Sequence, residues 1–188
     1  MRIISGSFKG KKIFTPTDKI TRPLKDLTKE SIFNIIKHSN KFKLNFSEGI
    51  ILDLFCGVGS FGIECLSRGV KKVIFIENYN KVITVLKKNL LSLKSVKNYE
   101  IIEKNIYSTD LFSKLNYKFD IIFLDPPYRD KDLKNLFIEI QKNKILNKNG
   151  IIILHRHKND SDYIPLNFNL IEEKVYGISK IIFLSYLS

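Results

Sequence analysis

Short apolar runs alternate with stretches of helical apolar spacing from residue 50 onward, and this alternation restricts the fold more than any other feature. We expect strands at 50–54, 73–76, 99–102, 121–124 and 151–154, with helices at 61–67, over 82–93, near 108–115 and over 133–140. Strands that are apolar along their whole length are covered on both faces, as in a parallel sheet. The sequence therefore predicts an α/β fold with a doubly wound, mostly parallel sheet.

The last part of the chain follows a different pattern. Two strand-like runs, at 170–176 and 178–186, are joined at Gly177 with no room for a crossover helix. Parallel neighbours need a long connection, whereas antiparallel neighbours need only a turn. We therefore expect an antiparallel hairpin at one edge of the sheet.

The first 49 residues form a second compositional region. Strand-like pieces at 2–4 and 12–14 flank a turn-rich segment, 5–10, which predicts a small β-hairpin. Apolar residues then recur at helical spacing up to about Lys37, which predicts one helix. We divide the chain into an N-terminal extension, 1–49, and a main domain, 50–188.

The charge of this 188-residue chain is strongly positive, at +13. Residues 1–49 hold 11 basic and 4 acidic side chains (+7), and residues 50–188 hold 21 and 15 (+6). An AT-rich genome also favours lysine, but it does not concentrate charge in one region. We therefore expect the extension to contact nucleic acid, through Lys9, Lys11, Lys12, Arg22 and Lys25. The alternative is a solvated lysine-rich face.

Several protein classes are excluded by what the sequence lacks. No apolar run approaches the roughly 18 residues of a membrane span, and the N-terminus has no signal-peptide core. Two cysteines, Cys56 and Cys65, are too few for a disulfide scaffold and lack metal-ligand spacing. We expect a cytoplasmic monomer with reduced thiols and no metal site.

A glycine-rich loop directly follows the first predicted strand. Its residues Gly57, Gly59 and Gly62 fit the dinucleotide-binding spacing, and Glu77 ends the second strand, where it can bond a ribose. NAD fits this spacing, but Asp53 at the strand end would repel a pyrophosphate. A carboxylate there suits S-adenosylmethionine (SAM), which carries a sulfonium and an ammonium group and no phosphate.

A second motif, Asp125-Pro126-Pro127-Tyr128, follows the fourth predicted strand. Two prolines stiffen the loop and remove two N–H donors. The Asp125 carboxylate and the Pro126 carbonyl can accept both hydrogens of one amino group, and the Tyr128 ring can stack on a base. The motif thus describes a receptor for the exocyclic amine of a nucleobase.

These two motifs together are typical of SAM-dependent amino-methyltransferases, and the rest of the chain resembles the RsmD family of 16S rRNA (guanine-N2) methyltransferases. The resemblance includes the Met1–Lys12 opening, Arg22-Pro23 with the helix that follows, Gly62–Gly69, and the strand after Gly177. It implies a class I methyltransferase fold, a Rossmann-like sheet with a small N-terminal hairpin and helix. It also implies SAM as cofactor and a partly assembled small ribosomal subunit as substrate.

The resemblance further assigns roles to individual residues. Asp53, Gly57 and Gly59 are expected to line the methionine part of SAM, Glu77 the ribose, and Asn105 with Ile106 the adenine; Phe55 and Cys56 are also expected to bind the cofactor. Asp125, Pro126 and Tyr128 are expected to be catalytic, with Pro127 beside the RNA. Cys56 has no partner base and is interpreted as a packing residue.

The sequence departs from the family at three places. Asn105 and Lys29 stand where Asp and Arg are usual, and His155-Arg156-His157-Lys158 replaces an acidic residue after the fifth strand. By the switch-point rule His155 and His157 lie on the ligand side of the sheet, where they could meet RNA, but we favour a solvated basic loop.

Three other functions remain open on the residues alone. An adenine-N6 or cytosine-N4 methyltransferase would use the same amine receptor. An NAD-dependent oxidoreductase would use the glycine loop, although Asp53 weighs against it. A non-catalytic RNA-binding protein would leave Asp125 and Tyr128 without a role.

Overall fold

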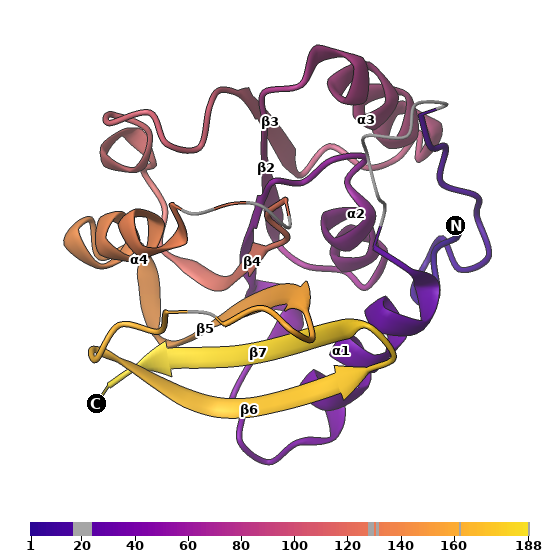
Figure 1. Cartoon of the computed structure of the whole chain (residues 1–188). Coiled ribbons are helices and arrows are strands. Elements are labelled where there is room, and N and C mark those ends of the chain that lie inside the picture. The colour runs from indigo at the N-terminus through magenta and orange to yellow at the C-terminus, as the bar shows by residue number, and fades with distance from the viewer. Residues whose placement is uncertain (17–23, 128–129, 131, 162, 188) are drawn as a thin grey trace.

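The computed structural model describes residues 1–16, 24–127, 130, 132–161 and 163–187, and it centres on one seven-stranded sheet (Figure 1). The strand order is β3-β2-β1-β4-β5-β7-β6. The strands are β1 Ile50–Leu54, β2 Lys72–Glu77, β3 Tyr99–Glu103, β4 Phe119–Leu124, β5 Leu146–His157, β6 Phe168–Tyr176 and β7 Ser179–Tyr186. Strands β1 to β5 pair in parallel, and β7 pairs antiparallel with both β5 and β6. The predicted mostly parallel sheet with an antiparallel C-terminal hairpin is confirmed.

The helices are α1 Asp26–His38, α2 Ser60–Ser67, α3 Asn80–Ser92 and α4 Leu133–Lys142, with short 3₁₀ turns at Phe46–Glu48 and Phe112–Lys114. The short helix expected near 108–115 is therefore only one 3₁₀ turn. The Ser113 hydroxyl donates to the Asp110 carbonyl at 3.1 Å, which is the kind of local bond that competes with a regular helix.

Alternate residues of each central strand face two separate cores. Ile51, Phe75 and Phe123 lie in the core that α1, α2 and α3 cover, whereas Leu52 and Leu124 lie in the core that α4 covers. Figure 1 shows the same arrangement, with α2 and α3 on one side of the sheet and α4 on the other. Both faces are buried, and for this reason the central strands are nearly continuous apolar runs.

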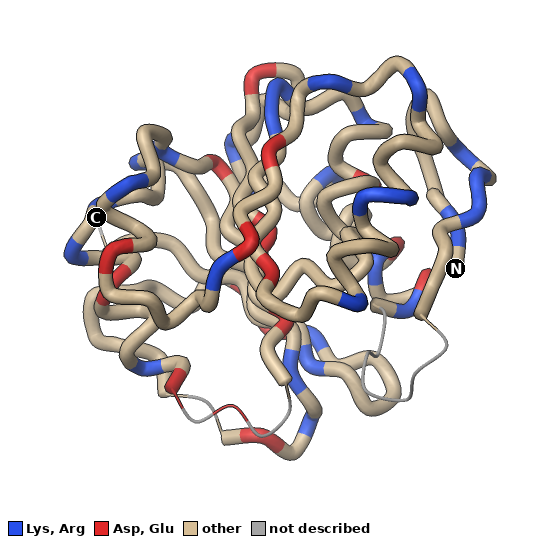
Figure 2. Tube along the Cα trace, turned by 90° about the horizontal axis from the view of Figure 1, so that it is seen from above, with Lys and Arg blue, Asp and Glu red and all other residues tan. Residues whose placement is uncertain are grey.

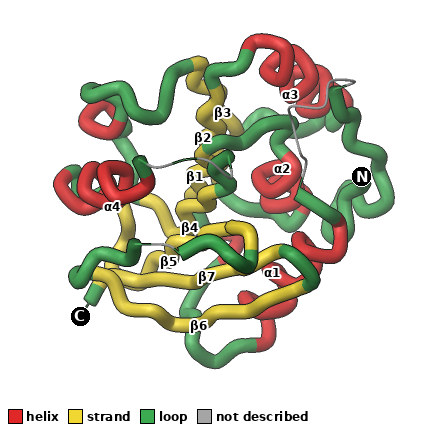
Figure 3. The backbone as a smooth tube through the Cα atoms, viewed as in Figure 1, coloured by secondary structure: helices red, strands yellow, loops and turns green. Residues whose placement is uncertain are grey.

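The N-terminal segment forms less regular β-structure than the sequence predicts. Its ends pair antiparallel at one isolated bridge, between Arg2 and Lys12, and Figure 3 draws the segment as a loop. Backbone bonds from Ile3 to Lys11 at 2.9 Å and from Ile13 to Met1 at 3.1 Å flank this bridge. The amides of Ile4 and Ser5 instead donate to the Glu64 carboxylate on α2, at 2.7 and 2.9 Å. These amides are therefore satisfied by α2 rather than by a longer hairpin.

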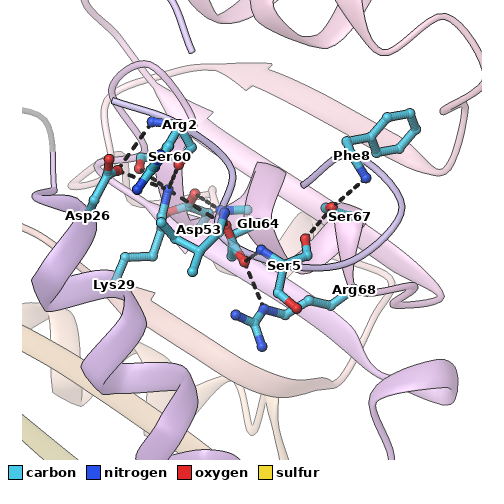
Figure 4. Close-up of polar contacts among 12 residues, drawn as sticks. Arg2, Ser5, Phe8, Asp26, Lys29, Asp53, Ser60, Glu64, Ser67 and Arg68 are labelled. Atoms are coloured by element: carbon cyan, nitrogen blue, oxygen red, sulfur yellow. Dashed lines mark hydrogen bonds and ion pairs between the residues drawn. The ribbon is translucent and has the colours of Figure 1, made fainter. Parts of the chain in front are cut away.

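Glu64 and Lys29 form a buried ion pair where the N-terminal segment, α1 and α2 meet (Figure 4). The Lys29 ammonium lies 3.7 Å from Glu64 and donates to the Arg2 carbonyl at 2.7 Å. Burial lowers the pKa of Lys29, and the nearby carboxylates oppose that shift. Arg68 completes the cluster with a 2.9 Å bond to Glu64, its guanidinium 4.0 Å from the Phe33 ring centroid.

Gly6 allows the segment to approach α2 closely. Its φ is +83°, and a Cβ there would lie 1.8 Å from the Ser67 carbonyl oxygen. The Phe8 amide donates to the Ser67 hydroxyl at 3.0 Å. Ile3 and Ile13 are buried in the same core as α2, so the segment shares a core with the sheet.

Candidate active site

A cavity of about 1110 Å³ opens at the carboxyl ends of the central strands. It is lined by residues at or just after the carboxyl ends of β1, β2, β3 and β4, by His155 within β5, and by residues just before α1. The strand order reverses between β1 and β4, and doubly wound sheets bind ligands at such a point. The lining includes most of the residues predicted from the sequence: Lys25, Asp53, Phe55, Cys56, Gly57, Glu77, Asn105, Ile106, Asp125, Pro126 and Pro127.

Asp53 lies at the floor of the cavity and is almost fully buried. Its Oδ2 accepts the Gly62 N–H at 2.9 Å, which ties the end of β1 to the first turn of α2. Burial raises the pKa of Asp53 well above its usual range, and the charges of Asp125 and Glu77 raise it further. The site therefore favours a ligand that brings positive charge to this carboxyl group.

Glu77 holds the glycine loop in place from the end of β2. Its two carboxylate oxygens accept the N–H groups of Gly57, Asn78 and Tyr79 at 3.0, 2.9 and 3.0 Å. A carboxylate has about four acceptor positions, so capacity remains for a further donor such as a hydroxyl group. The ribose contact remains a prediction that this geometry permits.

Gly59 turns the loop into α2. It caps the helix with φ +81°, and a Cβ at this position would lie 2.4 Å from the Leu86 side chain on α3. Phe55 also adopts a positive φ, of 56°, which is strained for a residue with a side chain. The loop backbone is thus held in a conformation that leaves the cavity open above it.

Cys56 lines the cavity but is buried, and burial raises the pKa of its thiol. A raised pKa keeps the sulfur protonated and unreactive. This agrees with the interpretation of Cys56 as a packing residue.

The segment after β3 brings Asn105, Ile106 and Tyr107 to the cavity. The Asn105 side-chain oxygen accepts the Tyr107 N–H at 3.0 Å. This oxygen has two lone pairs, so it can accept one further hydrogen bond from a ligand. The Tyr107 hydroxyl donates to Asp130 at 2.7 Å and connects the turn to the segment beyond the prolines. Burial and this bond raise the pKa of Tyr107. The sequence analysis did not identify Tyr107, which has no motif of its own.

The diproline corner follows β4 directly. Asp125 lies in the cavity wall, and its Oδ1 is 2.8 Å from Nδ1 of His155 on β5. The Pro127 carbonyl accepts a bond from Arg156 at 3.3 Å. The corner is therefore supported from β5 at two points. Tyr128, the expected stacking ring, lies outside the described residues.

The interpretation of 155–158 as a solvated basic loop is wrong for its first two residues. His155 is 8% exposed and Arg156 6%, because β5 continues to His157. Leu124 pairs in register with Leu154, so the next residues, Asp125 and His155, lie beside each other. The equal spacing from strand to Asp125 and to His155 was the signal that could have predicted this pair.

The predicted RNA-contacting lysines occupy different environments. Lys25 lines the cavity, and Lys9 and Lys12 are exposed in the N-terminal segment, where Lys and Arg gather in Figure 2. Lys11 is half-buried, because its ammonium donates to the Ser92 carbonyl at the end of α3. Arg22 lies outside the described residues.

The charge of the cavity is opposite to that of the chain. Among the described residues, its lining holds three carboxyl groups, of Asp53, Glu77 and Asp125, and one lysine, Lys25. Three acidic groups around one cavity attract a cation and repel a phosphate. The donor set therefore fits SAM, which carries sulfonium and ammonium groups.

Within the same described residues, no group of three or more His, Cys, Asp and Glu side chains is placed to hold a metal ion.

Comparisons with known proteins agree with this geometry. The family model described as "Conserved hypothetical protein 95" matches residues 1–185. Ribosomal RNA small subunit methyltransferase D of Haemophilus influenzae is 35% identical over 181 residues, which cover 95% of this chain and 90% of the relative. The Escherichia coli protein of the same name is 30% identical over 178 residues, covering 94% and 85%. The solved structure of yhhF from Escherichia coli superposes with a TM-score of 0.83 at 26% identity, covering 100% of this chain and 98% of that one.

No helix among the described residues has the length and apolar character that crossing a membrane requires.

Proposed function

The chain belongs to the RsmD family of rRNA methyltransferases, and from this premise we propose that it transfers the methyl group of SAM to the exocyclic N2 amine of a guanine in 16S rRNA. Its relatives of Haemophilus influenzae and Escherichia coli are named as methyltransferases of the small-subunit rRNA. The observation that carries the proposal is a cavity that combines an acidic glycine loop with the Asp125-Pro126 corner.

The glycine-loop side of the cavity would hold the cofactor. SAM, when bound, supplies an activated methyl group on a positively charged sulfur. Asp53 lies where its charge attracts the methionine part, Glu77 has acceptor capacity for the ribose, and Asn105 and Ile106 border the space for the adenine. The net negative lining supports SAM over NAD, whose pyrophosphate these carboxylates would repel.

The corner would act on the amine. The lone pair of guanine N2 is delocalised into the ring, which makes the amine a poor nucleophile. Hydrogen bonds from its two hydrogens to Oδ2 of Asp125 and to the Pro126 carbonyl favour a pyramidal nitrogen whose lone pair points at the methyl group. SAM would supply the methyl group, and Asp125 would accept the proton that the amine releases. Positioning and electrostatic stabilisation of the positive nitrogen supply most of the rate.

The target base must leave its stack to reach the corner. Unstacking costs less free energy for a loop nucleotide than for a paired one. An unpaired guanine of the assembling subunit is therefore the expected target. Lys25 at the cavity mouth, with Lys9 and Lys12, would contact the phosphates around it.

The decisive experiment combines methyl transfer with nucleotide mapping. Purified protein and SAM carrying a labelled methyl group are incubated with small subunits, or with 16S rRNA, from cells that lack this protein. Mass spectrometry of the digested RNA should then show one N2-methylguanine. A methyl group on adenine N6 or cytosine N4 instead would support the related alternative, and binding without transfer would support a non-catalytic RNA-binding protein.

A further inference from the structure

His155 and Asp125 lie side by side on neighbouring strands at the back of the cavity. Nδ1 of His155 is 2.8 Å from Oδ1 of Asp125, and the side chains are 10% and 23% exposed, respectively. The register that pairs Leu124 with Leu154 fixes this contact through the backbone. The pair is therefore built into the sheet, unlike a chance contact between flexible loops.

The surroundings of the ring indicate where its hydrogen lies. The Nε2 atom of His155 is buried and has no hydrogen-bond partner among the described residues. A hydrogen on Nε2 would be an unsatisfied buried donor, which costs roughly 1–3 kcal/mol. A hydrogen on Nδ1 instead bonds the carboxylate. The tautomer that carries its hydrogen on Nδ1 avoids a buried unsatisfied donor and leaves only the Nε2 lone pair without a partner, so His155 donates and Asp125 accepts.

This bond determines which oxygen of Asp125 is available. With Oδ1 engaged by His155, Oδ2 remains as the acceptor on a carboxylate that lines the cavity. Arg156, the next residue, donates to the Pro127 carbonyl at 3.3 Å and forms an ion pair with Asp160 at 3.3 Å. Successive residues of β5 thus hold both ends of the corner.

We propose that His155 is a positioning residue for the amine receptor, because its Nδ1–H fixes the rotamer of Asp125 and directs Oδ2 at the amine of the target base. This role rests on the proposed function. In this role His155 acts through Asp125 rather than on the target base itself. A misplacement of about 1 Å at a reacting group can cost roughly 100-fold in rate.

The test compares three variants at His155 and one control. His155→Leu removes the donor. His155→Asn carries its amide nitrogen on Cγ, where the ring carries Nδ1, and so restores a donor to Asp125. His155→Gln moves the amide toward the Nε2 position. His38→Leu, on the exposed surface of α1, is the matched histidine control.

We expect the Leu and Gln variants to lose roughly 10- to 100-fold in kcat, with the SAM Kd and the RNA KM within about 2-fold of wild type. His155→Asn should recover to within about 5-fold of wild type. In a background that already carries Asp125→Ala, His155→Leu should have no further effect on the rate. Wild-type kcat in the Leu variant, or an Asn variant as slow as Leu, would overturn the proposal.

A second measurement needs no substrate. The chain has three histidines, so long-range ¹⁵N–¹H correlation spectra resolve each ring. His155 should show a hydrogen on Nδ1, and the signal should change in the Asp125→Ala variant. A hydrogen only on Nε2 would overturn the inference even if guanine methylation is confirmed. If wild type methylates another base, the proposed function fails, while the spectra and the variants still decide the role of His155 on that base.

Discussion

The side-chain amide of Asn89, on α3, donates to the carbonyl of Val58 in the glycine loop at 3.1 Å. The same amide nitrogen donates to the Phe14 carbonyl at 3.1 Å, and the side-chain oxygen accepts the Phe14 N–H at 2.8 Å. One buried side chain therefore connects the glycine loop to the N-terminal segment, so a change in the position of one should alter the other.

Replacing Asn89 should disturb both partners at once. Asn89→Leu leaves polar backbone groups of Phe14 and Val58 without their partner, and each unsatisfied buried group costs about 1–3 kcal/mol. We expect a loss of about 2–4 kcal/mol in the free energy of unfolding, measured with urea, and weaker SAM binding by calorimetry. Asn143→Leu, at the end of α4, is the control and should leave SAM affinity unchanged.

Removing the charge of Asp53 should separate affinity from stability. Asp53→Asn keeps an oxygen that can accept the Gly62 N–H, but it loses the attraction for the sulfonium and ammonium groups. We expect SAM affinity to fall by about 10-fold or more, which corresponds to about 1.4 kcal/mol. Calorimetry measures this, and an unchanged affinity would contradict the assignment of Asp53 to the cofactor.

The same variant should be more stable than wild type, increasingly so as the pH rises. The pKa of Asp53 is raised in the folded state, so the folded protein holds this proton more tightly than the unfolded chain does. The contribution is favourable below the unfolded pKa of about 3.9 and is lost as the pH rises through the raised folded value. Urea titrations from about pH 4 to pH 8 should show this difference growing.

Adding a side chain at Gly59 should prevent SAM binding. Gly59→Ala places a Cβ 2.4 Å from Leu86 and forces the loop to move. Gly10→Ala is a matched control: its φ is also positive, at +85°, but no atom lies within 4 Å of the added carbon. Both variants bear backbone strain of about 1–2 kcal/mol, and only Gly59→Ala should lose binding in a calorimeter.

Removing the carboxylate at the corner should stop the chemistry and spare the cofactor. Asp125→Ala is expected to lower single-turnover methyl transfer by about 100-fold or more while SAM affinity changes little. Tyr128→Ala tests the stacking ring by the same assay. A wild-type single-turnover rate in either variant would show that its assigned role is wrong.

RNA affinity should depend on salt through the N-terminal lysines. Lys9→Ala with Lys12→Ala should reduce the slope of log affinity against log salt by up to about 0.7–0.9 per lost phosphate contact. Lys142→Ala, exposed on α4, is the control and should keep the wild-type slope. A slope that does not change would indicate that these lysines are merely solvated.

The sequence predicted the sheet well because strand periodicity and the glycine loop are local signals. It did not predict the burial of Glu64 and Lys29, since their partners lie elsewhere in the chain: Glu64 contacts residues about 60 positions away. His155 was misread for a related reason. A basic side chain near a strand end suggests solvent, and only the pairing of β4 with β5 brings Asp125 to it.

The contact of Ile4 and Ser5 with Glu64 also constrains how the chain can fold. The amides of Ile4 and Ser5 find their acceptor on a helix about 60 residues further along the chain. Until that helix forms they remain hydrated, and closing so long a loop slows the step. The N-terminal segment can therefore dock only once α2 has formed, and its contacts belong to the non-local set that slows folding.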